Sequence, residues 1–256
     1  MDIKAIFFDV NGTLIDILTD EGLPDIYRKI RNFLGYQGIF IHKSELRNLY
    51  YQIMKEQKTS SKNTMPEYDA TGIWRRIIEL KQTDFTRSLP PATLEALPFL
   101  LAQMHRAFSL CRKLQVYPDV YAVLDKLYTM YPLALISDAQ SAYAKPELNR
   151  CGLLKYFNPI IISGDYGYRK PDPRLFKMAL DHHQLDPKNV IFVGNDMYND
   201  VYGAKKLGMR SIFFASNQGD HNVHDGVQPD YIIRQFSELL TAIEFLKNTN
   251  YESNGA

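Results

Sequence analysis

The alternation of short apolar runs with helical stretches constrains the fold of this chain more than any other feature. Apolar runs rich in Ile, Val and Phe occupy residues 3–8, 133–136, 159–162, 190–193 and 211–214. Runs that are apolar on both faces are typical of parallel strands covered on both sides. Helical periodicity follows at residues 142–151, 174–183, 199–207 and 237–247. Alternating strands and helices predict a doubly wound α/β core.

The segment from residue 19 to residue 117 follows a different pattern. Helical periodicity occurs there at residues 23–34, 43–55, 72–81 and 93–112, with no convincing strand between them. A strand, a long helical stretch and then the rest of the sheet predict an all-helical subdomain inserted after the first strand. We expect the core at residues 1–18 and 117–250, the insertion at residues 19–116 and a disordered tail at residues 251–256.

Charge and composition exclude several classes of protein. Among 256 residues, 30 Lys and Arg stand against 29 Asp and Glu, so the net charge of +1 gives no reason to expect nucleic acid or an anionic membrane as a partner. No apolar run reaches the roughly 18 residues of a membrane span, and the start of the chain is unlike a signal peptide. The two cysteines, Cys111 and Cys151, lack metal-ligand spacing, as expected of reduced thiols in a cytoplasmic protein. The sequence leaves the oligomeric state open.

Polar residues cluster near the ends of the predicted strands. Residues 9–13 (Asp-Val-Asn-Gly-Thr) follow the first strand, residues 137–138 (Ser-Asp) follow the second, and residues 195–200 (Asn-Asp-Met-Tyr-Asn-Asp) follow the strand at 190–193. A fourth cluster, residues 169–171 (Arg-Lys-Pro), precedes a helix. Ligands of doubly wound sheets bind at the carboxyl ends of the strands, so these clusters are expected to meet in one cleft.

The first cluster has the chemistry of a nucleophilic site. Asp9 at a strand end is a carboxylate that can attack phosphorus or carbon and form a covalent ester, although a lone acid there would more often shape a turn. Gly12 permits a tight turn in which main-chain N–H groups face an oxyanion or phosphate. Thr13 offers its hydroxyl to the same anion, a role compatible with capping the next turn. We therefore expect Asp9 and Thr13 to be catalytic and Gly12 to contact the substrate.

The other clusters can bind the transferred group and a cation. Ser137 is expected to hydrogen-bond a phosphoryl oxygen or a substrate carboxylate, with Asp138 beside it at the substrate. Lys170 stands before a proline, which keeps it in a loop, where it can neutralise charge on the transferred group. Asp196 and Asp200 suit Mg²⁺, which prefers oxygen ligands, although acids also accumulate at helix N-termini because of the helix dipole.

With all four clusters in this order and spacing between residues 6 and 200, the chain resembles the haloacid dehalogenase-like hydrolase superfamily. The insertion resembles that family's helical cap of the first type. The resemblance implies a Rossmann-like core, a cap that closes over the cleft, and a nucleophile at Asp9. It further implies Mg²⁺ held by Asp9, the carbonyl of Asn11, and the cluster of Asn195, Asp196 and Asp200. It does not settle which small molecule is the substrate.

Two positions depart from the family pattern. Family phosphatases carry an aspartate for general acid–base catalysis two residues after the nucleophile, at the catalytic position that Asn11 occupies here. Such catalysis contributes roughly 10²–10⁴ in rate, so fast hydrolysis of ordinary alkyl phosphates is not expected. Asn195 stands where the last motif has its first aspartate, which lowers the charge available to a metal ion.

Three functions therefore stay open. The favoured one is a phosphatase with weakened acid–base chemistry, acting on a small phosphorylated metabolite. A metal-independent 2-haloacid dehalogenase also lacks the second aspartate, and Arg75, Arg76 and Trp74 are candidates to take up its halide. A catalytically impaired protein that binds a phosphorylated ligand is favoured by Asn11 and Asn195 together. The cap side chains expected at the substrate are Tyr68, Asp69, Trp74 and Arg75.

Overall fold

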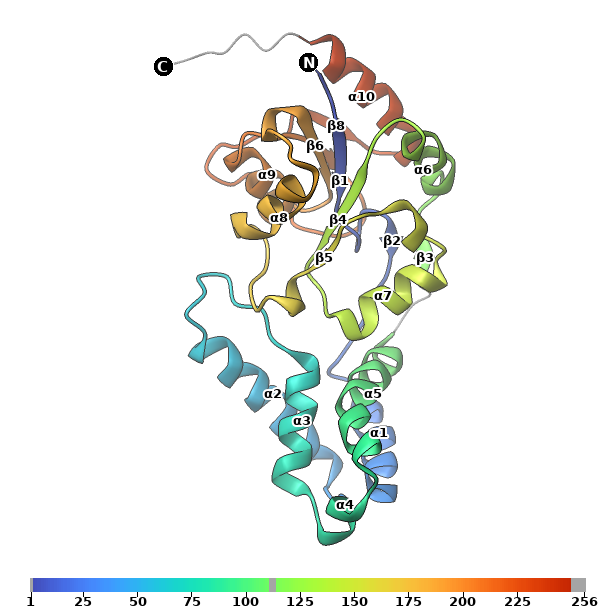
Figure 1. The fold of residues 1–256 in the computed structure, drawn as a ribbon, viewed down its shortest axis with the longest axis vertical. Helices are drawn as coiled ribbons and strands as arrows, with labels where there is room; N and C mark the ends of the chain where they lie inside the picture. Colours follow the sequence, from blue (N-terminus) through green and yellow to red (C-terminus); the bar gives the residue numbers. More distant parts are fainter. Residues whose placement is uncertain (1, 111–113, 250–256) are drawn as a thin grey trace.

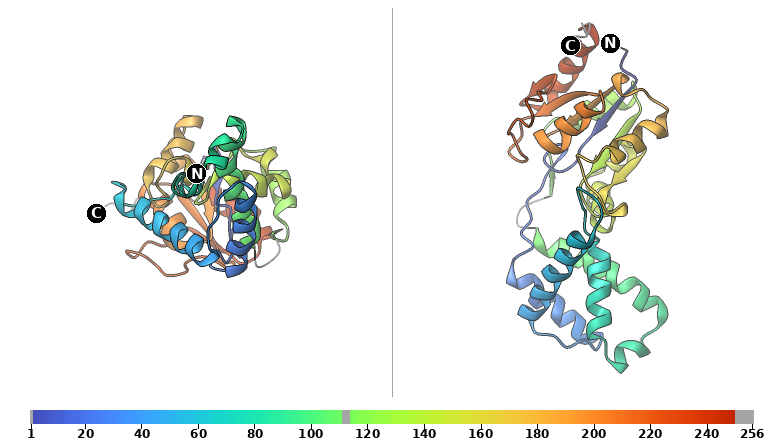
Figure 2. Two further views of the ribbon diagram at one scale, coloured as in Figure 1. Left: turned by 90° about the horizontal axis from the view of Figure 1, so that it is seen from below. Right: turned by 90° about the vertical axis from the view of Figure 1, so that its left-hand side faces the viewer.

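The computed structural model describes residues 2–110 and 114–249 (Figure 1). A lobe built around a sheet and a lobe made of helices lie end to end along the long axis of the molecule (Figure 2). The predicted tail at residues 251–256, and residues 111–112 of one predicted helix, lie outside the described residues. Within the described ranges, no helix has the length and apolar character needed to cross a bilayer.

The first lobe contains a sheet of six parallel strands in the order β5-β4-β1-β6-β7-β8. The strands are β1 (Ala5–Phe8), β4 (Leu133–Ser137), β5 (Ile160–Ile162), β6 (Val190–Gly194), β7 (Arg210–Phe214) and β8 (Tyr231–Ile233). β1 lies in the interior of the sheet, paired with β4 on one side and β6 on the other. The strand order reverses at β1, so its carboxyl end is the switch point at which such folds bind ligands. The predicted α/β fold is confirmed.

Helices cover both faces of this sheet (Figure 1). Helices α6 (Val120–Tyr128), α7 (Ser141–Arg150) and α10 (Leu239–Asn248) pack on one face, and α8 (Pro173–His183) and α9 (Gly203–Lys206) pack on the other. Along β1, Ile6 and Phe8 face the first set, whereas Ala5 and Phe7 face the second. All four side chains are fully buried. Burial on both faces explains why the strand is an uninterrupted apolar run in the sequence.

Most predicted core elements occur within a few residues of their expected positions, with three differences. The expected helix at residues 199–207 is divided into a π-helical segment, η4 (Met197–Tyr202), followed by α9. Helix α6 and strand β8 were not predicted. Short 3-10 turns complete the core: η1 (Leu154–Tyr156), η2 (Ser163–Asp165), η3 (Pro187–Asn189) and η5 (Phe236–Glu238).

In the part of the predicted insertion that the structure describes, the second lobe consists of five helices. They are α1 (Pro24–Tyr36), α2 (Lys43–Ser60), α3 (Ala70–Lys81), α4 (Asp84–Ser88) and α5 (Pro91–Ser109). Their buried centre is aromatic: Tyr50 lies 5.3 Å from Trp74 and 4.4 Å from His105, measured between ring centroids. The helices α2, α3 and α5 thus share one apolar core, which is continuous with the apolar cluster on one face of the sheet.

Two short strands connect the lobes. β2 (Ile15–Asp16) pairs antiparallel with β3 (Gln115–Val116), and a bridge between Thr19 and Leu110 continues this pairing toward the helices. The expectation that no strand lies between residues 19 and 117 is therefore wrong at β3. Two residues are too few for an alternating pattern to be detected. The bounds of the core and the cap, at residues 18/19 and 116/117, stay a prediction.

The loop between α2 and α3 forms another contact between the lobes. Asn63 donates from its side-chain amide to the carbonyl of Gly167 at 3.0 Å, and the main-chain N–H of Arg169 donates to the carbonyl of Met65 at 3.0 Å. Gln140 receives a hydrogen bond from the N–H of Ala70 at 3.0 Å. We call residues 63–70 the docking loop, because they attach the helical lobe to the core.

Candidate active site

Asp9 lies at the carboxyl end of β1, where the strand order reverses. Its N–H donates to the carbonyl of Val193 at 3.0 Å, which fixes the end of β1 against β6. One carboxylate oxygen accepts from the ammonium of Lys170 at 2.7 Å, and the other accepts from the hydroxyl of Thr13 at 3.0 Å. The side chain is thus held by charge and by a hydrogen bond at the position expected of a nucleophile.

The turn after Asp9 depends on a glycine. Gly12 has φ +84°, and a β-carbon there would lie 2.1 Å from the amide nitrogen of Asn195, so a larger residue does not fit. The N–H of Gly12 donates to the carbonyl of Ile15 at 2.8 Å. That group is engaged within the turn, and the contact of other main-chain N–H groups of this turn with an anion stays a prediction. The hydroxyl of the fully buried Thr13 lies 3.0 Å from both Asp9 and Asn195, so it too is engaged by protein groups.

Lys170 connects two acids beneath the cleft. Its ammonium donates to Asp9 at 2.7 Å and to Asp200 at 2.6 Å. Burial by itself lowers the pKa of Lys170, but Asp200 and Asp9 outweigh burial and raise it above its ordinary value. The ammonium therefore stays charged. Burial raises the pKa of Asp200, and the charge of Lys170 opposes that rise.

The last cluster is folded tightly around its own main chain. Asp196 caps η4 by accepting from the N–H groups of Tyr198 at 3.0 Å and Asn199 at 2.7 Å. It therefore occupies a helix N-terminus, the alternative to metal binding given in the sequence analysis for acids of this cluster. One oxygen of Asp200 accepts from the N–H groups of Asn195 and Asp196, each at 3.0 Å. The side chain of Asn195 is buried between Gly12 and Gly219.

These side chains surround a cavity of about 180 Å³. Its lining consists of Asp9, Asn11, Asp138, Arg169, Lys170, Asn195, Asp196, Asn199, Asp200, Gln218 and Gly219. Asp138 follows β4 and accepts from the N–H of Lys170 at 2.9 Å. Burial raises the pKa of Asp138, although Lys170 and Arg169 oppose the rise. Ser137, at the end of β4, is buried and lies outside this described lining.

Four lining residues were absent from the predicted site. Arg169 and Asn199 stand inside clusters that the sequence singled out, so their neighbours were the available signal. Gln218 and Gly219 follow β7, the fifth predicted strand, where the polar run Ser216, Asn217 and Gln218 was the available signal. Gly219 has φ +88°, and a β-carbon there would lie 2.3 Å from the carbonyl oxygen of Asn195.

The predicted cap contacts do not reach this cavity. Trp74 is fully buried among cap rings, and its indole nitrogen has no hydrogen-bond partner among the described residues. Arg75 is exposed on α3, and Asp69 caps that helix by accepting from the N–H of Gly72 at 2.9 Å. Tyr68 faces the core, where its hydroxyl lies 3.3 Å from that of Tyr143.

The donor set of the cavity suits only a weakly held metal ion. No three of the His, Cys, Asp and Glu residues in ranges 2–110 and 114–249 form a metal-binding group. The lining offers carboxylate oxygens and the amide oxygens of Asn11 and Asn195, a set that fits Mg²⁺ better than a softer metal. Four acids, Asp9, Asp138, Asp196 and Asp200, stand against two cations, Lys170 and Arg169, so the cavity can accept a further cation.

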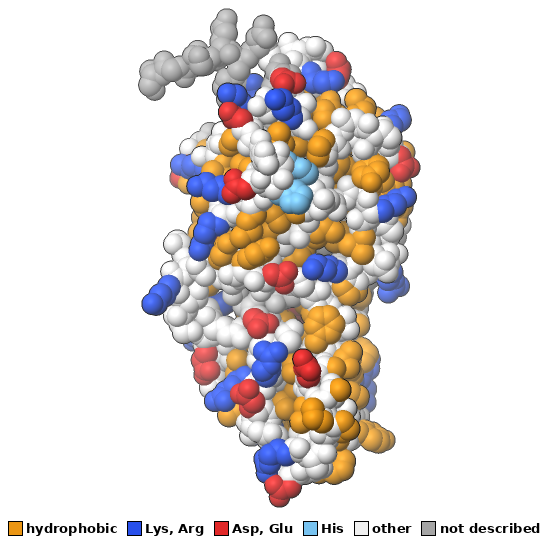
Figure 3. Space-filling model, in the orientation of Figure 1, with side chains coloured by type: hydrophobic (Ala, Val, Ile, Leu, Met, Phe, Trp, Pro, Cys, Tyr) orange, Lys and Arg blue, Asp and Glu red, His pale blue; other side chains and the backbone are white. Residues whose placement is uncertain are grey.

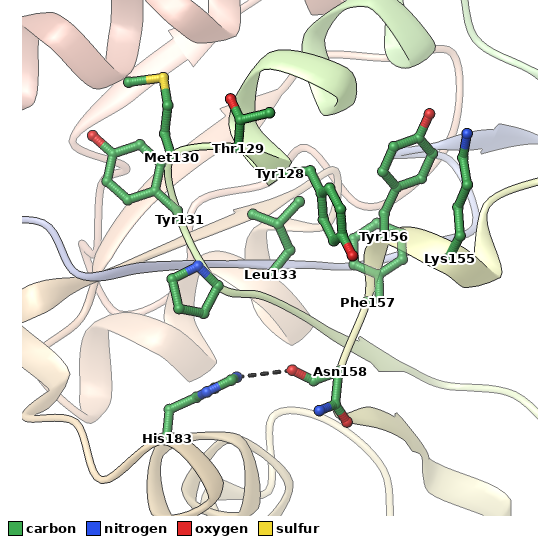
Figure 4. Close-up of a pocket in the computed structure, with 11 residues that line it drawn as sticks. Tyr128, Thr129, Met130, Tyr131, Leu133, Lys155, Tyr156, Phe157, Asn158 and His183 are labelled. Carbon is green, nitrogen blue, oxygen red and sulfur yellow. Dashed lines mark hydrogen bonds between the residues drawn. The ribbon is translucent and has the colours of Figure 1, made fainter.

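A larger hollow lies at the other end of the sheet (Figure 4). It measures about 480 Å³ and is lined around Leu133, the first residue of β4, by Tyr128, Tyr131, Tyr156 and other side chains. None of its described lining residues carries a carboxylate. On the face of the molecule in Figure 3, acidic and basic side chains are interspersed. Of these two hollows, only the smaller one, at the end of β1, is lined by carboxylates.

Comparison with known proteins identifies relatives over nearly the whole chain. A family model described as haloacid dehalogenase-like hydrolase matches residues 3–208. A glyceraldehyde 3-phosphate phosphatase from Pyrococcus abyssi is 27% identical, over 99% of each chain. The sequence and this relative thus correspond in both lobes.

Solved structures share the fold. A 2-haloacid dehalogenase from Pseudomonas syringae aligns with a TM-score of 0.69 at 22% identity, covering 95% of this chain and 99% of the dehalogenase. A HAD phosphatase from Thermococcus onnurineus aligns with a TM-score of 0.56 at 26% identity, covering 94% of this chain and 98% of the phosphatase. Both activities therefore occur on this arrangement of sheet and helices.

Proposed function

The chain belongs to the haloacid dehalogenase-like hydrolases, and from this premise we propose that it is a phosphatase that transfers the phosphoryl group of a small metabolite to Asp9. The observation that carries the proposal is the pairing of Asp9 with Lys170, at 2.7 Å, in a small cavity lined by polar side chains. The relative from Pyrococcus abyssi, named a glyceraldehyde 3-phosphate phosphatase, supports this choice of chemistry.

The reaction has two steps. A carboxylate oxygen of Asp9 forms a bond to phosphorus while the bond from phosphorus to the leaving oxygen breaks. Water then attacks the phosphorus of the aspartyl phosphate, the bond to Asp9 breaks, and inorganic phosphate leaves. Lys170 holds the Asp9 carboxylate in place and offsets negative charge that develops on the phosphoryl oxygens.

Asn11 determines which leaving groups depart readily. It lines the cavity at the position of the family's acid–base aspartate, but its amide has no titratable proton to donate. The leaving oxygen must take its proton from solvent. We therefore infer a preference for aryl and acyl phosphates, which leave as stable anions, over alkyl phosphates.

A magnesium ion is the proposed cofactor. Asp9, the carbonyl of Asn11, and Asp200 with the amide oxygen of Asn195 would hold it, and Asp196 lines the same cavity. When bound, the ion supplies positive charge for the phosphoryl oxygens. Because Asn195 contributes no charge, we expect this site to bind more weakly than one with an aspartate there.

Dehalogenation of a 2-haloacid is the second candidate, favoured by Asn11. The residues predicted to take up the halide do not lie at the cavity. Trp74 is enclosed in the cap, and Arg76 pairs with Glu79 on the surface at 3.2 Å. No observed side chain of the cap stands in for them at the cavity lining described above.

A substrate panel tests the proposal. Purified protein is incubated with aryl, acyl and alkyl phosphates, each with and without Mg²⁺, and with 2-chloropropionate. We expect release of inorganic phosphate, fastest from the acyl and aryl esters. Release of chloride without metal would replace the proposal with the dehalogenase, and binding of phosphate compounds without any turnover would replace it with a phospho-ligand sensor.

A further inference from the structure

Arg169 has an unusual place in the cavity wall, next to the buried Lys170. Both residues line the cavity that contains Asp9. The side chain of Lys170 is 2% exposed, whereas that of Arg169 is 40% exposed. The guanidinium of Arg169 has one described ion pair, with Asp138 at 3.5 Å. That distance is long for a hydrogen bond, so the guanidinium keeps donors available to a ligand.

The ammonium group of Lys170 is already paired with carboxylates of the protein. Its ammonium makes two short hydrogen bonds, to Asp9 at 2.7 Å and to Asp200 at 2.6 Å. A phosphate ester that approaches Asp9 brings further negative charge to a cavity that already contains Asp138 and Asp196. Like charges brought together in such a small, partly dehydrated cavity repel one another. Arg169 is the other cation among the described lining residues and can offset that repulsion.

The dimensions of the cavity bring Arg169 within reach of the reacting group. A sphere of 180 Å³ is about 7 Å across, so a phosphoryl group in contact with Asp9 also lies near the opposite wall. A guanidinium is a rigid fork of N–H donors that matches two oxygens of a phosphoryl group. The cavity is therefore large enough for one such group and small enough for Asp9 and Arg169 to share it.

The docking loop positions Arg169 from the cap. The main-chain N–H of Arg169 donates to Met65 at 3.0 Å, and the N–H of Glu67 donates to the carbonyl of Gly167 at 3.1 Å. On the core side, the carbonyl of Arg169 accepts from the N–H of Asp172 at 3.0 Å. The backbone that presents the guanidinium is thus fixed by both lobes, which is how a rigid binding residue is built.

We propose that Arg169 is the substrate-binding cation of this site, which grips the phosphoryl group that Asp9 attacks while Lys170 holds the nucleophile. This inference rests on the proposed phosphatase function. It assigns the two neighbouring cations different tasks: Lys170 holds the nucleophile and offsets charge that develops during transfer, and Arg169 binds the phosphoryl group of the incoming ligand.

Inorganic phosphate is the probe for this proposal, because it binds without turnover. Calorimetric titration in magnesium buffer gives its affinity for the unaltered protein, Arg169→Lys and Arg169→Ala. We expect Arg169→Ala to weaken binding by about 10- to 100-fold, as for loss of a charged hydrogen-bond donor. Arg169→Lys should fall between the two, since an ammonium keeps the charge but loses the fork. Free guanidinium ion at sub-denaturing concentration should restore part of the affinity of Arg169→Ala.

Arg174→Ala is the matched control. Arg174 lies in the same segment and bonds to the docking loop through Asn63 at 2.8 Å, but it is outside the cavity lining. We expect its phosphate affinity to stay within about two-fold of the unaltered protein, as for other exposed polar contacts. A ten-fold loss in Arg174→Ala would attribute the effect to the docking loop and overturn the assignment to the guanidinium of Arg169.

Two further outcomes separate this inference from the proposed function. Unchanged phosphate affinity in Arg169→Ala and Arg169→Lys overturns the inference, even if the protein hydrolyses phosphate esters. Phosphate binding that depends on Arg169, in a protein that hydrolyses no phosphate ester, keeps the inference and rejects the phosphatase. If Arg169→Ala does not fold, Arg169→Lys with unchanged affinity and unchanged kcat/KM overturns the inference on its own.

Discussion

At the scale of single residues, the proposed chemistry depends on the Asp9 carboxylate. Asp9→Asn replaces it with an amide that cannot attack phosphorus, and turnover should fall by at least about 10³-fold, as when other enzymes lose their nucleophile. The fold should persist, because Lys170 keeps its bond to Asp200. Phosphate release and circular dichroism measure the two effects. Asp186→Asn, at an exposed acid paired with Lys188, is the control that should retain full activity. Substantial turnover by Asp9→Asn would reject the proposed nucleophile.

Asn11 sets the dependence on leaving group. Asn11→Asp introduces the missing acid–base group, so turnover of alkyl phosphates should rise by at least about 10-fold, within the 10²–10⁴ that such catalysis contributes. Aryl phosphates should gain less, because they leave without a proton. The comparison of kcat for one alkyl and one aryl phosphate measures the difference. A loss of activity toward both substrates would show that Asn11 serves other chemistry, and dehalogenation would become the first candidate.

The Asn11-Gly12 pair is of the type that deamidates most readily, yet the structure opposes that reaction. Cyclisation requires the main-chain nitrogen of Gly12 to attack the Asn11 side chain, and this N–H donates to Ile15 at 2.8 Å. We expect folded protein to keep Asn11 amidated during storage, and unfolded protein to convert it. Peptide mass spectrometry on aged samples, with and without denaturant, tests this. Equal rates in the two samples would mean that the turn gives no protection.

The sequence identified the acids and Lys170 because strand ends and spacing determine where they lie. It placed Arg169 in a cluster without giving it a role, since nothing in a run of residues shows which of two adjacent cations will be buried between carboxylates. It also could not show that Thr13 and Gly12 are engaged by protein groups. Those contacts depend on Asn195, which is distant in the sequence and near only in the folded chain.

At the scale of helices and strands, the longest periodic elements were predictable, whereas the nine-residue helix α6 and the shortest strands other than β5 were not. α1, α2, α3 and α5 carry apolar faces over several turns, which produces a clear helical period. β2 and β3 contain two residues each, and β8 contains three, too few to establish a period. These segments are strands because they pair with neighbouring strands, which their own sequences do not reveal.

The aromatic core of the cap predicts acid sensitivity. Burial lowers the pKa of His105 to about 4, with a smaller contribution from Arg106. Because the folded-state pKa lies below the unfolded value, the unfolded chain binds the proton first and stability falls as the pH drops from 6.5 toward 4. Tyr27 donates to the carbonyl of Glu21, so its oxygen accepts from His105, whose ring carries the proton at Nε2.

Between pH 7 and pH 5, His105 should reduce the free energy of unfolding by about 2 kcal/mol. Trp74 is the single tryptophan of the chain and its ring lies 5.7 Å from His105, so its fluorescence reports on the cap. Urea unfolding at the two pH values measures the loss. His105→Phe keeps the ring packing and should lose correspondingly less stability on acidification. Equal losses in both proteins would show that other groups cause the acid sensitivity.

At the scale of the whole molecule, the lobes are joined by more than a pair of linkers. β2 and β3 connect them at one place, and the docking loop connects them again beside Arg169 and Gln140. Any separation of the lobes that changes access to the cavity must therefore break hydrogen bonds of the docking loop or move it together with the core segment at residues 163–170. The docking loop of the cap and the segment that carries Arg169 in the cavity wall are therefore expected to move together.

The interior position of β1 also has a consequence for synthesis on the ribosome. β1 leaves the ribosome first, but its partners begin at residues 133 and 190. At roughly 5–20 residues per second, the strand that carries Asp9 waits for about 6–25 seconds with both edges unpaired, while the cap helices, which depend on local contacts, can already form. Nascent chains arrested after residue 150 should protect the cap from proteolysis and leave residues 5–8 accessible to antibody or protease. During that interval a strand that is fully buried in the folded protein is an exposed apolar segment, and therefore a natural target for chaperones.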